Sequence, residues 1–387
     1  MIKMSNKKRG LLLLIICSVL VAKMTGCNQN NQDQEGLESS VDNETPTFKI
    51  GYIYTNHQTP LMMAAAKGDS FMEQGIYLKE VISKEKYVLM EDEKPIANLE
   101  LVVNKSGSET MTMLAQGHCD IGLASNTAFI TSKDQGNDVK ILAPVHTEGI
   151  GLVVGVDSGI EGWENFVNAV ESGDKPYTVG YHSPTSAPLI LFEAALQEAG
   201  ISYSKNPEDV DASIMLMDLK GTGNLIPAMT SGQVQAWVGP SPYPELAVTE
   251  KVGKIALDMK HLPPEGQWYD FPCCVIGTTD RVALENSYEM EKIVELISKS
   301  ADYCNEHMDE AAQVTSDFTG VSLDAAKLST IKYTANPSEE WINNMGLTYN
   351  TLKDTGKISN QLMEDDFEEA KDKIFDFSFI EAVKNSK

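Results

Sequence analysis

Three histidines occupy positions where a side chain could bind a small polar ligand. His57, His146 and His182 each lie in a polar segment that follows or interrupts an apolar run. An imidazole with a near-neutral pKa can donate a hydrogen bond to an oxyanion or accept one from an amide. His118 comes just after a predicted helix end and is expected on the surface. The histidines therefore indicate ligand hydrogen bonding as the chemistry to look for.

Polar turns rich in Ser, Thr and Asn lie where predicted strands end and predicted helices begin. Helix starts present unpaired N–H groups and a partial positive charge, so they can hold an anion without arginine. Ser, Thr and Asn are also favoured as structural N-caps, so any one turn leaves both readings open. The predicted ligand-binding residues are Thr55, Asn56, His57, Gln58, Ser108, Glu109, Ser125, Asn126, His146, His182, Ser183, Thr185, Ser186, Thr222, Ser241 and Tyr243. Lys105 and Lys220 precede two of these turns and either add positive charge or remain solvated.

Neither a metal nor a cofactor is expected. Cys119, Cys273, Cys274 and Cys304 match no zinc spacing, and adjacent cysteines are awkward as joint ligands of one ion. The histidines show no metal-type spacing with Asp or Glu. We expect small, buried, apolar cysteines; a disulfide stays open for an exported chain, but the sequence does not assign one.

The sequence does not predict an enzyme. It lacks a Gly-x-Ser-x-Gly elbow, a P-loop and a Gly-x-Gly-x-x-Gly fingerprint. The net charge of −25 makes nucleic acid and anionic lipid surfaces poor partners. Beyond the first residues Arg281 is the only arginine, so a guanidinium clamp on a carboxylate is scarcely available.

The elements that must position these residues occur twice along the chain. "KIGYIYTNHQTPLMMAAAKGDSFMEQGI" from Lys49 and "TVGYHSPTSAPLILFEAALQEAGI" from Thr178 share a Gly-Tyr strand, a polar turn, a Pro-Leu helix start and a closing Gly-Ile. Proline in the first turn and glycine after the end are the expected helix boundaries. "LVVNKSGSETMTMLAQGHCDIGLASN" and "IMLMDLKGTGNLIPAMTSGQVQAWVGPS" repeat a second strand–helix–strand unit. The repetition predicts two similar α/β lobes with parallel sheets covered by helices.

Two apolar runs would carry the chain between these lobes. "VKILAPVHTEGIGLVVGVDS" has a polar break at its centre, and "WYDFPCCVIGTTD" follows the second half. Two crossings form a hinge, and a ligand at the carboxyl ends of both sheets would lie between the lobes. We predict a first lobe of residues 48–147 and 275–387, completed by C-terminal helices, and a second lobe of residues 148–274.

These motifs resemble the two-crossover, type II periplasmic binding proteins of ABC importers. The similarity is strongest to the branch that serves nitrate, alkylsulfonates, taurine and thiamine-related pyrimidines, with "GSETMTMLAQGHCDIGLAS" and "GQVQAWVGPSPYPELA" among the segments that carry it. Gln235 and Ala236 replace the Asp-Ala usual in the second lobe, which leaves the ligand open.

The resemblance implies a monomer that closes on a small ligand and delivers it to an ABC permease and its ATPase. The ligand would be an anion such as sulfonate or nitrate, or a pyrimidine-type heterocycle if Tyr243 and Trp268 stack on a flat ring. A ligand-sensing domain of a membrane receptor is an alternative. A pyrimidine-synthase-like enzyme is a weaker one, since this chain has only "PCC" where those enzymes carry a cysteine-rich run.

The N-terminal segment predicts export. Basic residues precede an apolar run too short to span a bilayer, as in a signal peptide, which we place at residues 1–26. "MTGC" resembles the lipobox of bacterial lipoproteins, which makes Cys27 the predicted lipidation site. Residues 27–47 are polar and aperiodic, so we expect a disordered tether. The protein is therefore expected in the cell envelope, on the outer face of the cytoplasmic membrane or in the periplasm.

Overall fold

The computed structural model describes residues 45–385 of the chain. The predicted signal peptide, Cys27 and most of the predicted tether lie outside the described residues. In the part that is described, no helix is both long and apolar enough to cross a membrane. The last residues of the predicted tether belong to the fold, because the Pro46 carbonyl accepts a hydrogen bond from the Asn98 N–H at 2.8 Å and Thr47 opens the first strand.

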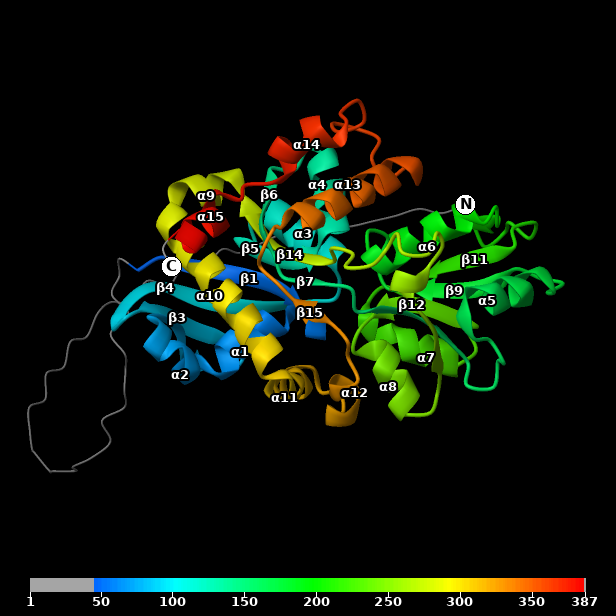
Figure 1. Ribbon diagram of the computed structural model, residues 1–387, viewed down its shortest axis with the longest axis horizontal. Helices are drawn as coiled ribbons and strands as arrows, with labels where there is room; N and C mark the ends of the chain where they lie inside the picture. The colour runs from blue at the N-terminus through cyan, green and yellow to red at the C-terminus, as the bar shows by residue number, and fades with distance from the viewer. Residues whose placement is uncertain (1–44, 386–387) are drawn as a thin grey trace, which may run out of the picture. The chain divides into compact units, whose positions relative to one another are not determined.

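A seven-stranded sheet forms the centre of the first lobe (Figure 1). Its strands, in spatial order, are β2 (Ile76–Ile82), β3 (Lys86–Glu91), β4 (Lys94–Asn104), β1 (Thr47–Ile53), β5 (Ile121–Ser125), β14 (Cys274–Thr279) and β6 (Val139–Pro144). Strand β1 runs parallel to β4 and β5, whereas β14 pairs antiparallel with β5 and β6. A Cβ on Gly51 would lie 2.7 Å from the Asn104 amide nitrogen, so the Gly-Tyr pair of β1 meets a steric requirement.

The first sheet is mixed rather than parallel as predicted. Strands β2, β3 and β4 pair antiparallel in sequence order. Lys84 and Asp92, in the turns that join them, have left-handed backbones with φ of 62° and 51°. Strands joined by such short turns can only pair antiparallel, and the strand–helix alternation found elsewhere in the chain concealed this meander.

A six-stranded sheet forms the centre of the second lobe. Its strands, in spatial order, are β10 (Tyr203–Ser204), β11 (Ile214–Asp218), β9 (Tyr177–Tyr181), β12 (Ala236–Pro240), β8 (Ile150–Val154) and β13 (Lys254–Asp258). Strands β10, β11, β9 and β12 are parallel, and β8 is antiparallel to β12 and β13. Each sheet thus contains one antiparallel strand that adjoins a crossing, as in a two-crossover fold.

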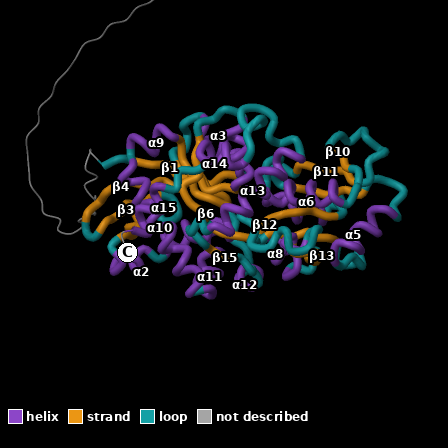
Figure 2. The backbone as a smooth tube through the Cα atoms, turned by 45° about the horizontal axis from the view of Figure 1, so that its top comes forward, coloured by secondary structure: helices purple, strands orange, loops and turns teal. Residues whose placement is uncertain are grey.

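The helices flank the sheets, as the tube in Figure 2 shows. Those between strands are α1 (Thr59–Ala66), α2 (Gly68–Phe71), α3 (Gly107–Ala115), α4 (Asn126–Asp134), α5 (Gly162–Glu171), α6 (Ala187–Glu198), α7 (Leu225–Thr230) and α8 (Tyr243–Thr249). Pro60 and Pro188 lie in the first turns of α1 and α6. Gly75 and Gly200 follow these helical segments with φ of 83° and 67°, which confirms the boundaries predicted from the repeat.

The C-terminal part of the chain is helical. It contains α9 (Asp280–Glu285), α10 (Ser287–Glu306), α11 (Met308–Thr319), α12 (Leu323–Lys327), α13 (Glu339–Asp354), α14 (Phe367–Ile374) and α15 (Ser378–Asn385). Helix α10 packs on α1 and α15, so these helices cover the first lobe as predicted. In addition, α12 contacts α8 and α13 contacts α6, so the C-terminal part also reaches the second lobe.

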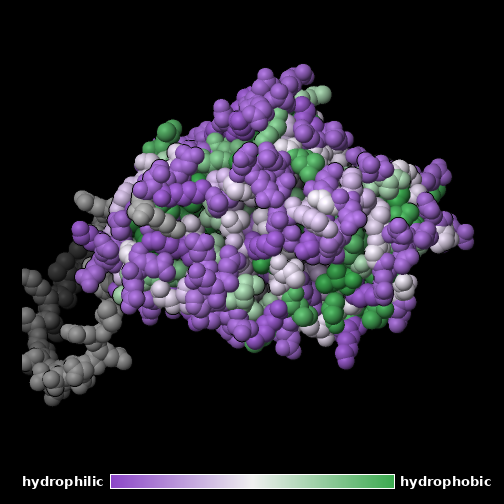
Figure 3. All heavy atoms as spheres, in the orientation of Figure 1, coloured by the Kyte–Doolittle hydropathy of each residue, from purple (hydrophilic) through white to green (hydrophobic). Residues whose placement is uncertain are grey.

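Apolar side chains fill both lobes. Tyr52, Met62 and Phe71 are fully buried in the first lobe, and Phe192 and Trp237 in the second. Hydrophilic residues cover most of the face drawn in Figure 3, in keeping with the strongly acidic composition. The lobe boundaries within the two crossings stay a prediction.

Candidate functional site

The strand-end turns of the two lobes meet around a small cavity. The space open to the centre of a water-sized sphere is about 30 Å³. The lining residues are Ile53, Thr55, His57, Gln58, Gly107, Ser125, His182, Ser186, Ala187, Pro188, Thr222, Pro240, Cys273 and Cys274. Both halves of the sequence repeat therefore contribute polar and apolar residues to one small cavity.

On the first-lobe side, the chain leaves β1 and forms a 3₁₀ turn, η1 (Asn56–Gln58), before α1. This places Thr55, His57 and Gln58 on the cavity. Ser125 ends β5, and its Oγ caps α4 by accepting the Ala128 N–H at 3.3 Å. The lining residue Ser125 is thus both an N-cap and a cavity residue, so the two readings of such turns are compatible.

On the second-lobe side, β9 leads through residues 182–186 into α6. The Ser186 hydroxyl donates to the Ser183 carbonyl at 2.8 Å and does not cap the helix. No side chain therefore caps the start of α6, which lies beside the cavity residues Ser186, Ala187 and Pro188. Thr222, in the 3₁₀ turn η3 (Thr222–Asn224), completes this wall.

No lysine or arginine is among the lining residues. Lys105 is exposed, and Lys220 is exposed and pairs with Asp218 at 2.6 Å, so both are solvated rather than cleft residues. Burial, with a smaller effect of nearby His57, lowers the pKa of His182 to about 4, so its imidazole is neutral at pH 7. The buried His182 Nδ1 and Gln58 Oε1 have no hydrogen-bond partner. The cavity thus offers neutral hydrogen-bonding groups.

Three predicted residues join the lobes at the rim instead of lining the cavity. The Ser108 hydroxyl lies 2.7 Å from that of Ser183 and 2.9 Å from that of Thr185. The Thr185 carbonyl also accepts from Thr127 Oγ1 at 2.6 Å. A further predicted residue, Tyr243, bridges the lobes by donating to the Tyr54 carbonyl at 3.1 Å. The lobes are therefore in direct polar contact.

The other predicted residues off the cavity wall make contacts that explain their presence structurally. Asn56 donates to Ser329 Oγ, and Asn126 donates to the Pro272 carbonyl. Glu109 accepts the Lys105 N–H, and the Ser241 hydroxyl donates to Glu245. His146 is buried beside His57, with ring centres 4.1 Å apart. Some of these contacts are local and others join distant parts of the chain, and polar residue type alone does not separate either kind from ligand contacts.

Sequence reasoning missed some of the lining residues. Gly107 and Pro240 lie inside turns already predicted to face the cleft, but these two residues were not among the predicted binding residues. Cys273 and Cys274 lie at the second predicted crossing, which was the available signal, but their apolar character suggested core packing. Tyr243 and Trp268 were considered as possible ring-stacking groups, yet neither lines the cavity, and Trp268 is buried in the core.

A larger hollow of about 740 Å³ lies elsewhere, between α9, α10 and α15. Its lining includes Lys140, Tyr288 and Phe379 but no strand-end turn of the second lobe. Because it gathers none of the predicted binding residues, the smaller cavity remains the candidate site.

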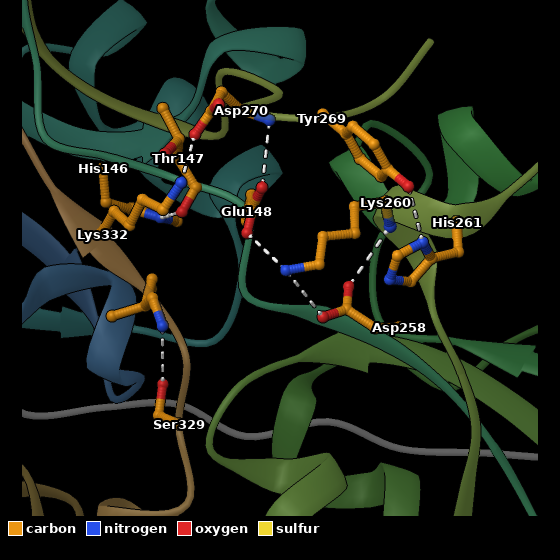
Figure 4. A network of polar contacts seen from close by, with 11 residues as sticks. His146, Thr147, Glu148, Asp258, Lys260, His261, Tyr269, Asp270, Ser329 and Lys332 are labelled. Carbon is orange, nitrogen blue, oxygen red and sulfur yellow. Dashed lines mark hydrogen bonds and ion pairs between the residues drawn. The ribbon is translucent and has the colours of Figure 1, made fainter. Parts of the chain in front are cut away.

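The two crossings pair with each other at the hinge. The Cys274 carbonyl accepts from Val145 N–H at 2.9 Å, and the Phe271 carbonyl accepts from Glu148 N–H at 3.0 Å. Glu148 has a left-handed backbone, with φ of 62°. Its carboxylate accepts the Asp270 N–H at 3.0 Å and the Lys260 ammonium at 3.0 Å, as Figure 4 shows. These contacts hold the first crossing in its bent path beside the cavity.

The described fold is that of a periplasmic binding protein, with two α/β lobes around a hinge. The NMT1-like family model matches residues 42–316, so the chain belongs to the NMT1-like family. The chain is 34% identical over 150 residues to the uncharacterized protein MJ1180 of Methanocaldococcus jannaschii, a match that covers 38% of this chain and 96% of that protein.

Solved structures share this fold at low sequence identity. The nitrate-binding protein NrtA from Synechocystis PCC 6803 is 15% identical with a TM-score of 0.69, over 89% of each chain. The ligand-binding component of an ABC-type import system from Staphylococcus aureus, solved with zinc bound, is 17% identical with a TM-score of 0.67, over 88% of this chain and 99% of that one. At these identities the likeness concerns the fold.

Proposed function

We propose that the protein is an extracytoplasmic solute-binding protein that captures a small oxyanion-bearing solute between its lobes and delivers it to an ABC permease. The observation that carries the proposal is the enclosed cavity lined by strand-end turns of both lobes. Two proteins with this fold also support it: one is named as a nitrate-binding protein and the other as the ligand-binding component of an ABC-type import system. A binding role, rather than catalysis, accounts for these features.

The size and lining of the cavity favour a small ligand. A cavity of about 30 Å³ exceeds the minimum of about 10–15 Å³ needed to hold one water molecule and is comparable to the share of about 30 Å³ that each water has in the liquid. A solute larger than that requires the lobes to part slightly. The Thr55 hydroxyl and the start of α6 can donate to oxyanion oxygens, whereas the Ser186 and Thr222 hydroxyls already donate to Ser183 and Tyr243. No aromatic ring other than imidazole lines the space, so a stacked pyrimidine is less favoured.

The location is part of the same proposal. Cleavage after residue 26 and lipidation of Cys27 would hold a monomeric binding domain at the membrane through the tether of residues 27–47. The ligand would bridge the lobes and stabilise their closed arrangement through contacts that the open form lacks. The closed complex would then dock on the permease.

Ligand binding by the purified full-length protein tests the proposal. Nitrate, methanesulfonate, taurine and a pyrimidine are compared by thermal shift and calorimetric titration. We expect one of the oxyanions to raise the Tm, and His182→Gln to weaken its binding by about tenfold, or ~1.4 kcal/mol. His118→Gln, at an exposed histidine, is the matched control and should bind as the wild type does.

Two outcomes contradict the proposal. A response to the pyrimidine alone would show that the ligand class is wrong. Equal affinities of the wild type and His182→Gln for the bound oxyanion would place the ligand outside this cavity.

A further inference from the structure

Four buried metal-ligating side chains meet at the hinge. Donor atoms of His57, His146, Cys273 and Cys274 all lie within 4.8 Å of one another. The four residues are between 0% and 4% exposed, so their polar atoms are sheltered from bulk water. Three of them belong to the two crossings, and His57 comes from η1 of the first lobe. Residues far apart in the chain thus form one compact N₂S₂ cluster.

The distances from His57 to the two sulfurs fit a tetrahedral ion. His57 Nδ1 lies 3.5 Å from Cys273 Sγ and 3.7 Å from Cys274 Sγ. With Zn–S bonds of about 2.3 Å and Zn–N bonds of about 2.0–2.1 Å, neighbouring S and N ligands of a tetrahedral zinc lie roughly 3.5–3.6 Å apart. The two sulfurs therefore already stand near the distances that a shared ion requires.

Both imidazoles present an unprotonated nitrogen to the cluster. His57 Nε2 lies 2.7 Å from the Gly149 carbonyl, and His146 Nδ1 lies 3.2 Å from the Thr147 carbonyl. A carbonyl oxygen can only accept a hydrogen bond, so His57 Nε2 and His146 Nδ1 carry the protons. His57 Nδ1 then faces the sulfurs with a lone pair, and the buried His146 Nε2 has no hydrogen-bond partner. Backbone carbonyls orient zinc-bound histidines in this way.

We propose that His57, His146, Cys273 and Cys274 bind one thiophilic metal ion, for which Zn²⁺ is the best match. A tetrahedral S₂N₂ set is characteristic of zinc. Because all four positions are supplied by the protein, the ion is structural and ties both crossings to the first lobe. The ion reaches the cluster from the cleft, since His57, Cys273 and Cys274 line the cavity. The metal site therefore adjoins the proposed solute site and shares these three residues with the cavity wall.

Metal analysis of the full-length protein tests the site. Protein kept reduced is incubated with Zn²⁺, freed of excess ion and analysed for zinc; a parallel sample receives Co²⁺. We expect about one zinc per chain, N₂S₂ coordination by X-ray absorption, and thiolate-to-cobalt charge-transfer absorption. The Cys273→Ser/Cys274→Ser variant should lose zinc and the cobalt absorption. Cys119→Ser/Cys304→Ser removes two buried cysteines outside the cluster and should retain both signals.

A second variant tests the site in case the double cysteine variant does not fold. His146→Gln keeps both sulfurs and should weaken zinc binding roughly tenfold or more. The proposal is overturned if the reduced wild type retains neither ion, if X-ray absorption shows only oxygen and nitrogen ligands, or if zinc content is unchanged in Cys273→Ser/Cys274→Ser. Solute titration reads a different signal, so failure of one proposal is distinguishable from failure of the other.

Discussion

Asp134 in the first lobe and Glu245 in the second are both buried carboxylates, but their partners differ. Asp134 ends α4, and its oxygens accept backbone N–H groups of Ser359, Asn360 and Leu362 at 2.9–3.2 Å. Glu245 lies in the first turn of α8 and accepts one hydrogen bond, from Ser241 Oγ at 2.6 Å. The second oxygen of Glu245 has no hydrogen-bond partner.

This difference sets opposite pKa shifts. Burial acts to raise the pKa of Asp134, but the N–H donors outweigh it and hold that pKa below the usual value. Burial raises the pKa of Glu245, and the single hydrogen bond from Ser241 does not offset it. The fully hydrogen-bonded Asp134 carboxylate therefore stabilises the first lobe and anchors the end of α4, whose start lines the cavity. The second lobe contains, close to the hinge, a carboxylate whose ionisation opposes folding.

Glu193 lies between these extremes, at the contact of the lobes. Its carboxylate, 2% exposed, pairs with Lys205 of the second lobe at 2.6 Å and with Lys357 of the C-terminal part at 3.0 Å. Lys357 follows α13, which contacts α4 of the first lobe and α6 of the second. We expect separation of the lobes to break the pair with Lys357 and to keep the pair with Lys205.

The largest expected effect is that of Asp134→Ala. The variant leaves backbone N–H groups of residues 359–362 without an acceptor, so we expect the free energy of unfolding to fall by about 3–5 kcal/mol at pH 7. A depressed pKa contributes stability above the unfolded value of about 3.9 that is lost as the pH falls through the folded value. Denaturant titrations from pH 7 to pH 3 should show the difference shrinking; a constant or absent difference would refute the account.

Lys357→Met should have a smaller effect, because Glu193 keeps Lys205. We expect a loss of about 1–2 kcal/mol in the free energy of unfolding and a several-fold weaker solute affinity, since the closed form loses a contact. Lys205→Met removes the partner within the second lobe and is the matched control. Calorimetric titration should show weaker binding for Lys357→Met only. Equal losses of affinity would mean that the pair does not distinguish the closed form.

Glu245→Gln should have the smallest effect, with the opposite sign. A raised carboxyl pKa means that stability is greatest at low pH and is lost as the pH rises from the unfolded value of about 4.3 through the folded value. The neutral amide removes this loss, so we expect the free energy of unfolding to rise by about 1 kcal/mol at pH 7.5 and not at pH 4. Urea titrations at the two pH values measure it. Destabilisation at pH 7.5 would show that the Glu245 charge is satisfied after all.

The local signals in the sequence predicted the elements and their repetition. Pro60 and Pro188 fix the backbone φ at the starts of α1 and α6, and Gly75 and Gly200 supply the positive φ after them. The two apolar crossings were also recognisable. These signals act between neighbouring residues and can therefore be recognised in the sequence. The fold class predicted from them is confirmed. The β2–β4 meander was missed, since its short turns contain neither Asn-Gly nor Asp-Gly.

The site was only partly predictable from the sequence. The cleft-facing turns were recognised as a set, but Ser125 and Ser108 look alike in sequence, and only packing puts one on the cavity and the other at the rim. The binding roles of these residues stay a prediction. The membrane-proximal location also stays a prediction, because Cys27 lies outside the described residues.

The sequence by itself determined where strands, helices and crossings begin and end, because proline, glycine and apolar periodicity act within a few residues. Only the tertiary structure decided that His57 meets Cys273 and Cys274, more than 200 positions later in the chain. That meeting depends on β14 entering the first sheet between β5 and β6. Strand order is set by the packing of the whole lobe, and no local pattern of residues specifies it.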